Sequence, residues 1–243
     1  MNASYGRGNR VLDALSGTSR AAIVPLLELV PVAPGDVIDG PGSTRHYVDF
    51  PIDAVLSVVA DTQRGDMCEV GTIGNEGVSG SEVAFGASVL RRIFCQVSGA
   101  SARIEAERFA TIVRADAAFG ALIARVEHAQ RYFVEQQCAC NGLHSITERC
   151  ARWLLLLHDR VGRDEFDLTQ EFLSVMLGVR RASVSEAAEL IASRGAITYR
   201  RGRMTILNRA VLEAMVCECH AVTRRAFDNA LRMGDRDSAL LAP

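Results

Sequence analysis

Residues 168–207 constrain the fold of this chain more than any other stretch, because they carry the signals of two short helices in succession. Thr169 is a residue type that caps helices, and an apolar helical pattern follows it. Gly178 interrupts that pattern, and a second helix is predicted over residues 180–194 before Gly195 ends it. Apolar residues of the two helices would pack across the turn, so the spacing predicts a helix-turn-helix.

A β-hairpin is predicted directly after the second helix. Residues 197–200 and 203–207 are typical of strands, and Arg201-Gly202 lies between them as a two-residue turn. A short exposed helix beside an arginine-tipped hairpin suits a DNA groove and its flanking backbone. The sequence therefore predicts a winged helix-turn-helix that binds DNA. The residues expected to contact DNA are Thr169, Gln170, Arg180, Arg181, Ser183, Glu186, Arg200, Arg201 and Arg203.

Charge supports this interpretation only when it is counted locally. The whole chain has 27 basic and 29 acidic residues, a balance that alone argues against a nucleic-acid partner. Residues 178–209, however, hold seven arginines and two glutamates, for a net charge of +5. Three of those arginines lie within residues 200–203. The alternative, an ordinary solvated helix face, does not explain why they gather at the hairpin tip.

Length and composition limit the remaining classes of protein. The 243 residues are enough for one or two domains. No apolar run reaches the roughly 18 residues of a membrane span, so no contact with a membrane is expected. Residues 1–10 are polar and lack the apolar segment of a signal peptide. The seven cysteines are an odd number without framework spacing, so we expect reduced thiols in a cytoplasmic protein.

The N-terminal part of the chain is predicted to be mostly β, after a short helix near residues 20–29. Short apolar runs alternate with turn signals rich in glycine, proline and aspartate. The runs that are most typical of strands cover residues 47–50, 54–60, 68–73 and 91–97. Many short strands at this spacing predict a small antiparallel barrel or jelly roll.

A long helix is predicted from Asp116 to Leu143, spanning about 42 Å at 1.5 Å per residue. Apolar or small residues recur along it in a 3-4 alternation, interrupted by one glutamine. This seam consists of Phe119, Leu122, Val126, Ala129, Phe133, Gln136, Cys140 and Leu143. We expect it to form a parallel coiled coil in a homodimer, since a helix-turn-helix protein needs two-fold symmetry to span two half-sites. The alternative is that the seam packs on the β-domain of its own chain.

Further helices are predicted after this seam. Asn141-Gly142 is expected to break the long helix and start a hinge over residues 141–145, before a capping box opens a helix over 146–161. A final helix is expected from Asn208 to about residue 231. The residues after Met233 are expected to form a frayed tail.

The order of these elements resembles the cAMP receptor protein/FNR (CRP/FNR) family of bacterial transcription regulators, over roughly residues 20–207. The most specific match is the helix-turn-helix, in residues 168–171 and 177–184. The resemblance implies an α+β fold whose N-terminal domain is a double-stranded β-helix (a jelly roll of the cyclic-nucleotide-binding type). It implies a β-barrel sensor domain over 11–115, a dimerisation helix and hinge over 116–144, and a winged helix-turn-helix domain over 145–231. The implied partners are double-stranded DNA, a second copy of the chain, RNA polymerase and a small-molecule effector of unknown identity.

The resemblance also suggests individual roles in the recognition helix. Arg181 falls where the family places an arginine that reads guanine, a bidentate contact that discriminates by about 1–3 kcal/mol. Ala182 and Glu186 depart from the Glu and Arg that read the family's best-known site, so a different base sequence is expected. Arg180 replaces a capping serine, and we assign it to a phosphate.

The sensor domain departs further from the family pattern. Members that bind cyclic nucleotides carry a Gly-Glu-Leu run for the ribose and a later Arg-Ser or Arg-Thr for the cyclic phosphate. The matching residues form the expected effector pocket, which consists of Gly80, Ser81, Glu82, Arg91 and Arg92. Ser81 replaces the ribose-binding carboxylate and Arg92 replaces the hydroxyl, so a cyclic nucleotide is not expected. The first cysteine is Cys68, so the N-terminal cysteine group of an iron–sulfur sensor is not expected either.

No metal site, cofactor or catalytic residue is predicted. The pairs Cys138/Cys140 and Cys217/Cys219 fall in predicted helices, where residues two apart point about 200° away from each other. Haem at His46 is not expected, because a lone histidine is more often a surface or core residue. Two alternatives to the effector-controlled regulator remain. One is a metal-dependent barrel enzyme with an accessory DNA-binding domain, and the other is a DNA-binding protein without an effector.

Overall fold

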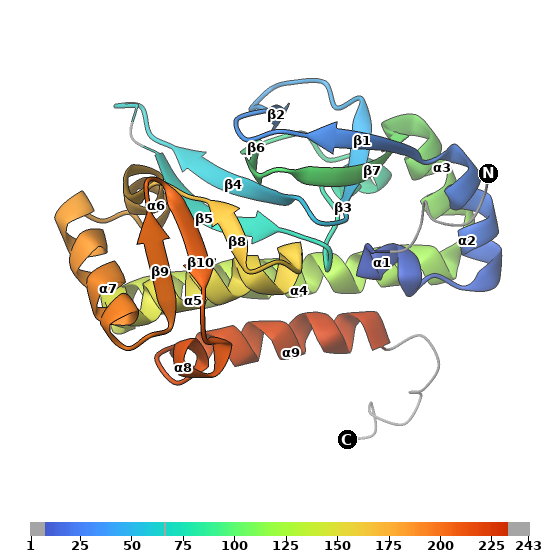
Figure 1. Ribbon diagram of the computed structural model, residues 1–243. Helices are drawn as coiled ribbons and strands as arrows, with labels where there is room; N and C mark the ends of the chain where they lie inside the picture. The colour runs from blue at the N-terminus through green and yellow to red at the C-terminus, as the bar shows by residue number, and fades with distance from the viewer. Residues whose placement is uncertain (1–7, 66, 233–243) are drawn as a thin grey trace, which may run out of the picture.

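A computed structural model of the protein describes residues 8–65 and 67–232. Strands fill most of the N-terminal half, one long helix runs along the molecule, and helices with a small sheet form the C-terminal half (Figure 1). This arrangement confirms the expected α+β fold class. None of the helices in the described ranges is long and apolar enough to cross a membrane.

Two short helices precede the first strand. They are α1 (Arg10–Asp13) and α2 (Gly17–Ile23), and a 3-10 turn, η1 (Val24–Leu26), follows them. The single helix expected near residues 20–29 is therefore wrong in its bounds. Pro25 lacks the N–H that would continue the ladder of α2, and Leu29 belongs to a strand instead.

Two antiparallel sheets form the N-terminal domain. The first has the strand order β1 (Glu28–Val32), β7 (Gly99–Glu105), β3 (Tyr47–Pro51). The second has the order β2 (Val37–Asp39), β6 (Arg92–Val97), β4 (Val55–Asp61), β5 (Met67–Ile73). All four of the predicted strands are present, as β3 to β6. The 3-10 helix η2 (Ser81–Phe85) connects β5 to β6.

The long helix α4 (Ala117–Leu143) follows α3 (Ala106–Ala115) after a break at Asp116, whose carboxylate accepts the N–H of Phe119 at 3.0 Å. The helix continues through Asn141-Gly142 and ends only where His144 turns to an extended conformation. The break predicted at Asn141-Gly142 is therefore wrong. One glycine costs a helix only about 1 kcal/mol, which does not end it by itself.

The apolar seam of α4 is buried within the chain, and so the coiled coil predicted along it is wrong. Phe119, Leu122 and Val126 belong to the core of the β-domain, while Ala129 and Phe133 pack with Phe227 and other residues of the C-terminal half. Cys140 is fully buried, and of the seam residues only Leu143 is strongly exposed, at 79%. A 3-4 alternation predicts a buried face but not whether the chain itself or a second copy covers it.

The C-terminal half begins with α5 (Ile146–Val161), which has the predicted capping box between Ser145 and Glu148 and ends at Gly162. Its further elements are β8 (Glu165–Asp167), α6 (Gln170–Leu177), α7 (Arg181–Ser193), β9 (Ile197–Arg200), β10 (Arg203–Ile206), α8 (Arg209–Glu213) and α9 (Cys219–Arg232). The final helix expected from Asn208 to about 231 is thus two helices with a non-helical link at 214–218. The predicted tail after Met233 lies outside the described residues.

Candidate nucleic-acid interface

The helix-turn-helix has the local structure that the sequence predicts. The Thr169 hydroxyl oxygen accepts the N–H of Phe172 at 3.0 Å, which caps α6. Gly178 takes a left-handed conformation (φ 63°) that ends α6 and turns the chain into α7. Val184 and Ile191 are completely buried on the inner face of α7, so the opposite face of this helix is presented outward.

The outward face of α7 carries the predicted DNA-contacting residues. Arg180, Arg181 and Glu186 are exposed, and Ser183 is half-buried. The side chain of Arg181 is 68% exposed and lies 3.9 Å from an equally exposed Glu171. A pair this long and this solvated contributes little, so the guanidinium is free to bind a partner.

Gln170 is less available than the sequence suggests. Its side-chain oxygen accepts the hydroxyl of Ser185 at 2.8 Å, and its backbone N–H donates to the Tyr199 hydroxyl at 3.2 Å. These two bonds join the start of α6 to α7 and to the hairpin. Gln170 therefore fixes the relative positions of the elements as well as lying beside the exposed face.

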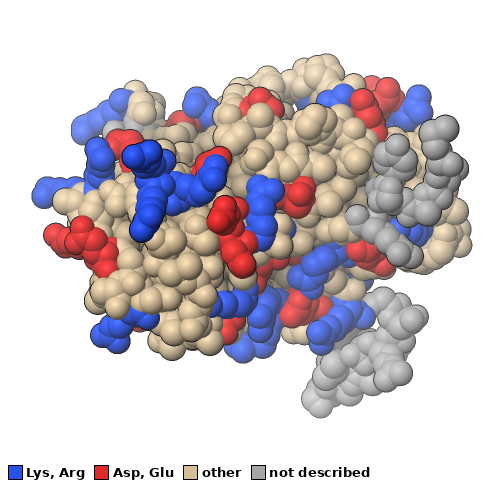
Figure 2. Space-filling model, viewed as in Figure 1, with Lys and Arg blue, Asp and Glu red and all other residues tan. Residues whose placement is uncertain are grey.

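The hairpin of β9 and β10 pairs Arg200 opposite Arg203, and Arg201-Gly202 forms the turn. Both turn residues have positive φ, 49° and 80°, as the favoured two-residue hairpin turns require. Arg200, Arg201 and Arg203 are all exposed. Figure 2 shows basic side chains gathered over this end of the C-terminal half.

A third strand holds the hairpin against the helices. β8 pairs with β10, an element that the sequence did not predict, and the N–H of Leu168 donates to the Gly202 carbonyl at 2.7 Å. Arg203 lies 3.5 Å from Asp167 of β8, in an exposed and weak ion pair. The hairpin is therefore connected to the start of α6 through Asp167 and Leu168.

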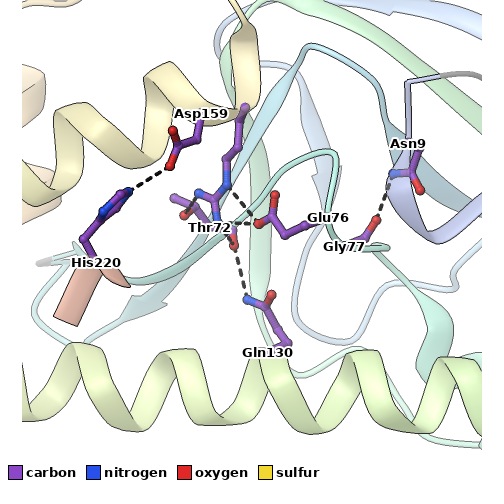
Figure 3. Close-up of polar contacts among 8 residues, drawn as sticks. Asn9, Thr72, Glu76, Gly77, Gln130, Asp159 and His220 are labelled. Carbon is purple, nitrogen blue, oxygen red and sulfur yellow. Dashed lines mark hydrogen bonds and ion pairs between the residues drawn. The ribbon is translucent and has the colours of Figure 1, made fainter. Parts of the chain in front are cut away.

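Arg160 of α5 connects this DNA-binding half to the β-domain, while Arg149 of the same helix binds α6 within the half. Arg160, which is 4% exposed, donates to Glu76 from Nε at 2.9 Å and from Nη2 at 2.5 Å, and it also contacts the Thr72 hydroxyl. Figure 3 shows this network, with Gln130 of α4 donating to the Thr72 carbonyl at 3.2 Å. Arg149 of the same helix donates to the Leu177 carbonyl at the end of α6.

Sequence reasoning missed these buried arginines. Arg149 lies four residues before Trp153, and Arg160 lies four residues after Leu156, so both fall on the apolar stripe of α5. The sequence signal that could have identified them is the presence of an arginine at each end of the apolar stripe, where a buried side chain is expected. Such a residue must be paired when it is buried, which predicts an acidic or carbonyl partner on a neighbouring element.

A second polar contact between the two halves centres on Glu69 of β5. Trp153 of α5 donates its indole N–H to this carboxyl group at 2.9 Å, and the Ser57 hydroxyl donates to it as well. Burial raises the pKa of Glu69 to about 7, against the opposing effect of these two donors. The interface therefore holds a carboxyl group that titrates near neutral pH.

The residues of the expected effector pocket do not all lie together in the structure. Gly80, Ser81 and Glu82 lie at η2, where the Ser81 hydroxyl donates to Glu127 of α4 and Glu82 lies 3.5 Å from the buried guanidinium of Arg45. Arg91 and Glu82 line a surface hollow of about 640 Å³ beside α4. Arg92 does not join them, because it pairs with Asp61 at 3.2 Å.

The expectation that no metal ligands come together is wrong for one group of residues. Cys217 lies in the link between α8 and α9, so it does not share a helix with Cys219, and both thiols face Cys140 and His144. Cys138 remains exposed and outside this group. His220 is also outside it, because its ring bonds to Asp159 at 2.8 Å (Figure 3).

Comparison with known proteins supports the interpretation of both halves. Residues 148–215 match the Crp-like helix-turn-helix domain. No curated protein matches the chain in sequence. A putative transcriptional regulator of the CRP/FNR family from Eubacterium rectale is similar in structure, with a TM-score of 0.64 and 18% identity over 88% of this chain and 99% of that one.

Two further solved structures have the same fold. FixK2 from Bradyrhizobium japonicum matches with a TM-score of 0.63 and 14% identity, over 79% of this chain and 98% of that one. The c-di-GMP responsive regulator CLP from Xanthomonas campestris matches with a TM-score of 0.60 and 15% identity, over 79% and 100%. The resemblance to the CRP/FNR family is confirmed by the domain match together with this shared fold.

Proposed function

We propose that this protein, which carries a Crp-like helix-turn-helix domain and the fold of CRP/FNR regulators, is a cytoplasmic, homodimeric transcription regulator that binds a two-fold symmetric DNA site. The observation that best supports the proposal is the exposed Arg181 at the start of α7, beside three exposed hairpin arginines. α7 enters the major groove, where Arg181 pairs with a guanine. Arg180 and the hairpin arginines contact phosphates.

The homodimer is proposed to form through the outward face of α4, opposite its buried seam. Exposed residues recur there at spacings of three and four, namely Ala121, Ala124, His128, Arg131, Glu135 and Cys138. Phe85, which is 58% exposed, lines the hollow beside Ala124 and Val134. Large apolar groups next to small helix residues favour the approach of a second helix, which supports this face as the dimer contact.

Control is proposed to pass from the β-domain to the DNA-binding half through the contacts of α5 with β5. The effector is proposed not to be a cyclic nucleotide, because Ser81 bonds to Glu127 and Arg92 bonds to Asp61. A ligand in the hollow beside Arg91 would touch the same face of α4 that the dimer uses. RNA polymerase is the proposed partner at the promoter.

Selection of random double-stranded DNA by the full-length protein tests this function. We expect an enriched inverted repeat whose half-site centres lie about one helical turn apart, since each protomer presents one α7. Changing Arg200, Arg201 and Arg203 together to alanine should weaken binding to all sequences. It should lower the salt slope of log K by about five units, because the dimer loses six phosphate contacts at about 0.9 units each. Recovery of no common sequence, or of a single unrepeated half-site, would contradict the proposal.

Cross-linking tests the dimer face. A short bismaleimide should join two copies of the wild-type chain through the exposed Cys138, and Cys138→Ser should abolish the product. Cys68→Ser is the matched control, because this half-buried thiol lies on β5. Ala124→Arg should shift the protein to monomer in sedimentation, because two like charges would meet at the helix contact. Equal cross-linking of Cys138→Ser would place the dimer contact elsewhere.

A further inference from the structure

Three cysteines and one histidine meet where α4 ends. Cys140 lies in the last turn of α4, His144 caps that helix, Cys217 lies in the link after α8, and Cys219 is the first residue of α9. Their candidate ligand atoms all lie within 4.8 Å of one another. The three cysteines are each less than 5% exposed. The group therefore closes around a common centre that is shielded from solvent.

The distances within the group fit one tetrahedral ion. The thiol sulfurs of Cys140 and Cys217 are 3.6 Å apart, and Nδ1 of His144 is 3.5 Å from the sulfur of Cys219. A tetrahedral Zn²⁺ with bonds of about 2.3 Å to sulfur and 2.0–2.1 Å to nitrogen places two sulfurs about 3.8 Å apart, and a sulfur and a nitrogen about 3.6 Å apart. The distances between these side chains are therefore already close to those between the ligands of a tetrahedral Zn²⁺ ion.

The surroundings of the group also suit a metal. Nδ1 of His144 faces the thiols, while its Nε2 lies 3.4 Å from the carboxylate of Glu218. A carboxylate on the far nitrogen is the usual partner of a metal-binding histidine, because it fixes the tautomer and orients the ring. Gln136 adds a side-chain N–H that donates to the sulfur of Cys219 at 3.1 Å.

Charge gives an independent reason for an ion at this place. Arg152 of α5 is 2% exposed and interacts electrostatically with Cys140, Cys217 and Cys219. Its Nε and Nη2 atoms have no hydrogen-bond partner among the described residues. Its Nη1 donates to the side-chain oxygen of Gln137, and its guanidinium lies over the ring of Phe133, but neither contact brings a full negative charge. Beside neutral thiols this buried guanidinium has little compensating charge, which is costly. Three thiolates and a neutral imidazole around Zn²⁺ carry a net charge of −1, which balances Arg152.

We propose that Cys140, His144, Cys217 and Cys219 form a structural Zn²⁺ site. Four protein ligands leave no open position, which is typical of structural rather than catalytic zinc. The ion displaces the three thiol protons when it binds. It ties the end of α4 to α9 and to the link after α8, directly beside the start of α5. The site therefore connects α4, which packs on the β-domain, to the DNA-binding half.

Metal analysis of the full-length protein tests this proposal. After expression in zinc-supplemented medium and purification with reductant, mass spectrometry of the metal content should find about one zinc per chain. Cys217→Ser together with Cys219→Ser should lose it. Cys138→Ser is the matched control and should keep it, because this thiol lies two residues from Cys140 but outside the group. His144→Cys should also keep zinc, since four thiolates form a common structural site.

Two further measurements test coordination directly. Replacement of zinc by Co²⁺ should give the intense visible bands of a tetrahedral thiolate site, and these bands should shift in His144→Cys. Removal of the ion by a chelator should lower the melting temperature of the wild type by several degrees but leave the cysteine double variant unchanged.

Several results would overturn the proposal. They are far less than one zinc per chain in the wild type, zinc retained by the cysteine double variant, or iron as the bound metal. A metal-free protein with a disulfide between Cys140 and Cys217 would also overturn it. A cysteine double variant that fails to fold leaves the test to His144→Cys, where loss of the cobalt bands would contradict the assigned ligand set.

Discussion

Arginine plays two different parts in the two faces of the DNA-binding half. On the outer face, Arg181 and the hairpin arginines project into solvent with at most weak ion pairs. On the inner face, Arg149, Arg152 and Arg160 of α5 are almost completely buried. The chain contains no lysine, so both groups consist of arginine and residue type alone does not separate them.

The two groups differ in how much hydrating water each guanidinium has lost on folding and in which protein partners it has gained. An exposed arginine keeps its water and gains little inside the protein, so its binding energy is available to a phosphate or a base. A buried arginine has given up its water and is stabilised only by its partners, as Arg160 is by Glu76 and Thr72. We therefore expect outer-face changes to alter DNA binding and inner-face changes to alter stability.

The largest effect is expected at Arg160. Arg160→Met should lower the free energy of unfolding by about 3–5 kcal/mol, because it leaves the Glu76 carboxylate buried without its partner. Urea unfolding monitored by circular dichroism measures this change. Combining Arg160→Met with Glu76→Gln should restore most of the loss. Arg163→Met is the control, because exposed Arg163 makes a single bond to the Ser98 carbonyl and should change stability by less than about 1 kcal/mol.

The next largest effect is a dependence of stability on pH through Glu69. Its pKa is raised from 4.5 to about 7 in the folded protein, so the folded state holds a proton that the unfolded state has released. The resulting stabilisation is fully present below pH 4.5 and is lost as the pH rises to about 7, by about 3 kcal/mol in total. Unfolding of the wild type and of Glu69→Gln across this range isolates the effect.

Glu69→Gln should reduce, but not abolish, the fall in the free energy of unfolding between pH 4.5 and about 7. Asp49, whose pKa burial raises to about 6, acts with the same sign and remains in the variant. Identical profiles for the wild type and Glu69→Gln would mean that water reaches Glu69 in solution and that the contact between Trp153 and β5 is loose.

The smallest effect is expected on the outer face, at Arg181. Arg181→Ala should leave the unfolding curve unchanged and reduce discrimination at one base of each half-site by about 1–3 kcal/mol. Binding to the selected operator and to single-base variants of it measures this loss. Full discrimination by Arg181→Ala, or a stability loss as large as that of Arg160→Met, would show that the two groups of arginines do not differ as described.

The features that sequence reasoning predicted are local ones. The cap at Thr169, the turn at Gly178 and the Arg201-Gly202 hairpin depend on residues only a few positions apart, and all three are present. Short-range backbone preferences decide such features, so tertiary packing rarely changes them.

The features that it missed depend on partners far away in the chain. The α4 seam has the spacing of a buried face, but the residues that cover it lie in the β-domain and about ninety positions later in α9. Cys217 and Cys219 reach Cys140 only because the chain leaves the helix at 214–218, which no turn residue marks. The ion pair of Arg160 joins residues 84 apart. No spacing rule covers contacts of this kind.

The packing of α9 on α4 has a consequence for the order in which the protein is made. Phe133 leaves the ribosome long before Phe227, its neighbour in the folded chain. At roughly 5–20 residues per second, the ninety or so residues between them take about 5–18 s to synthesise. The nascent chain therefore leaves this apolar face of α4 uncovered for seconds, and the packing of α4 is completed only when α9 emerges.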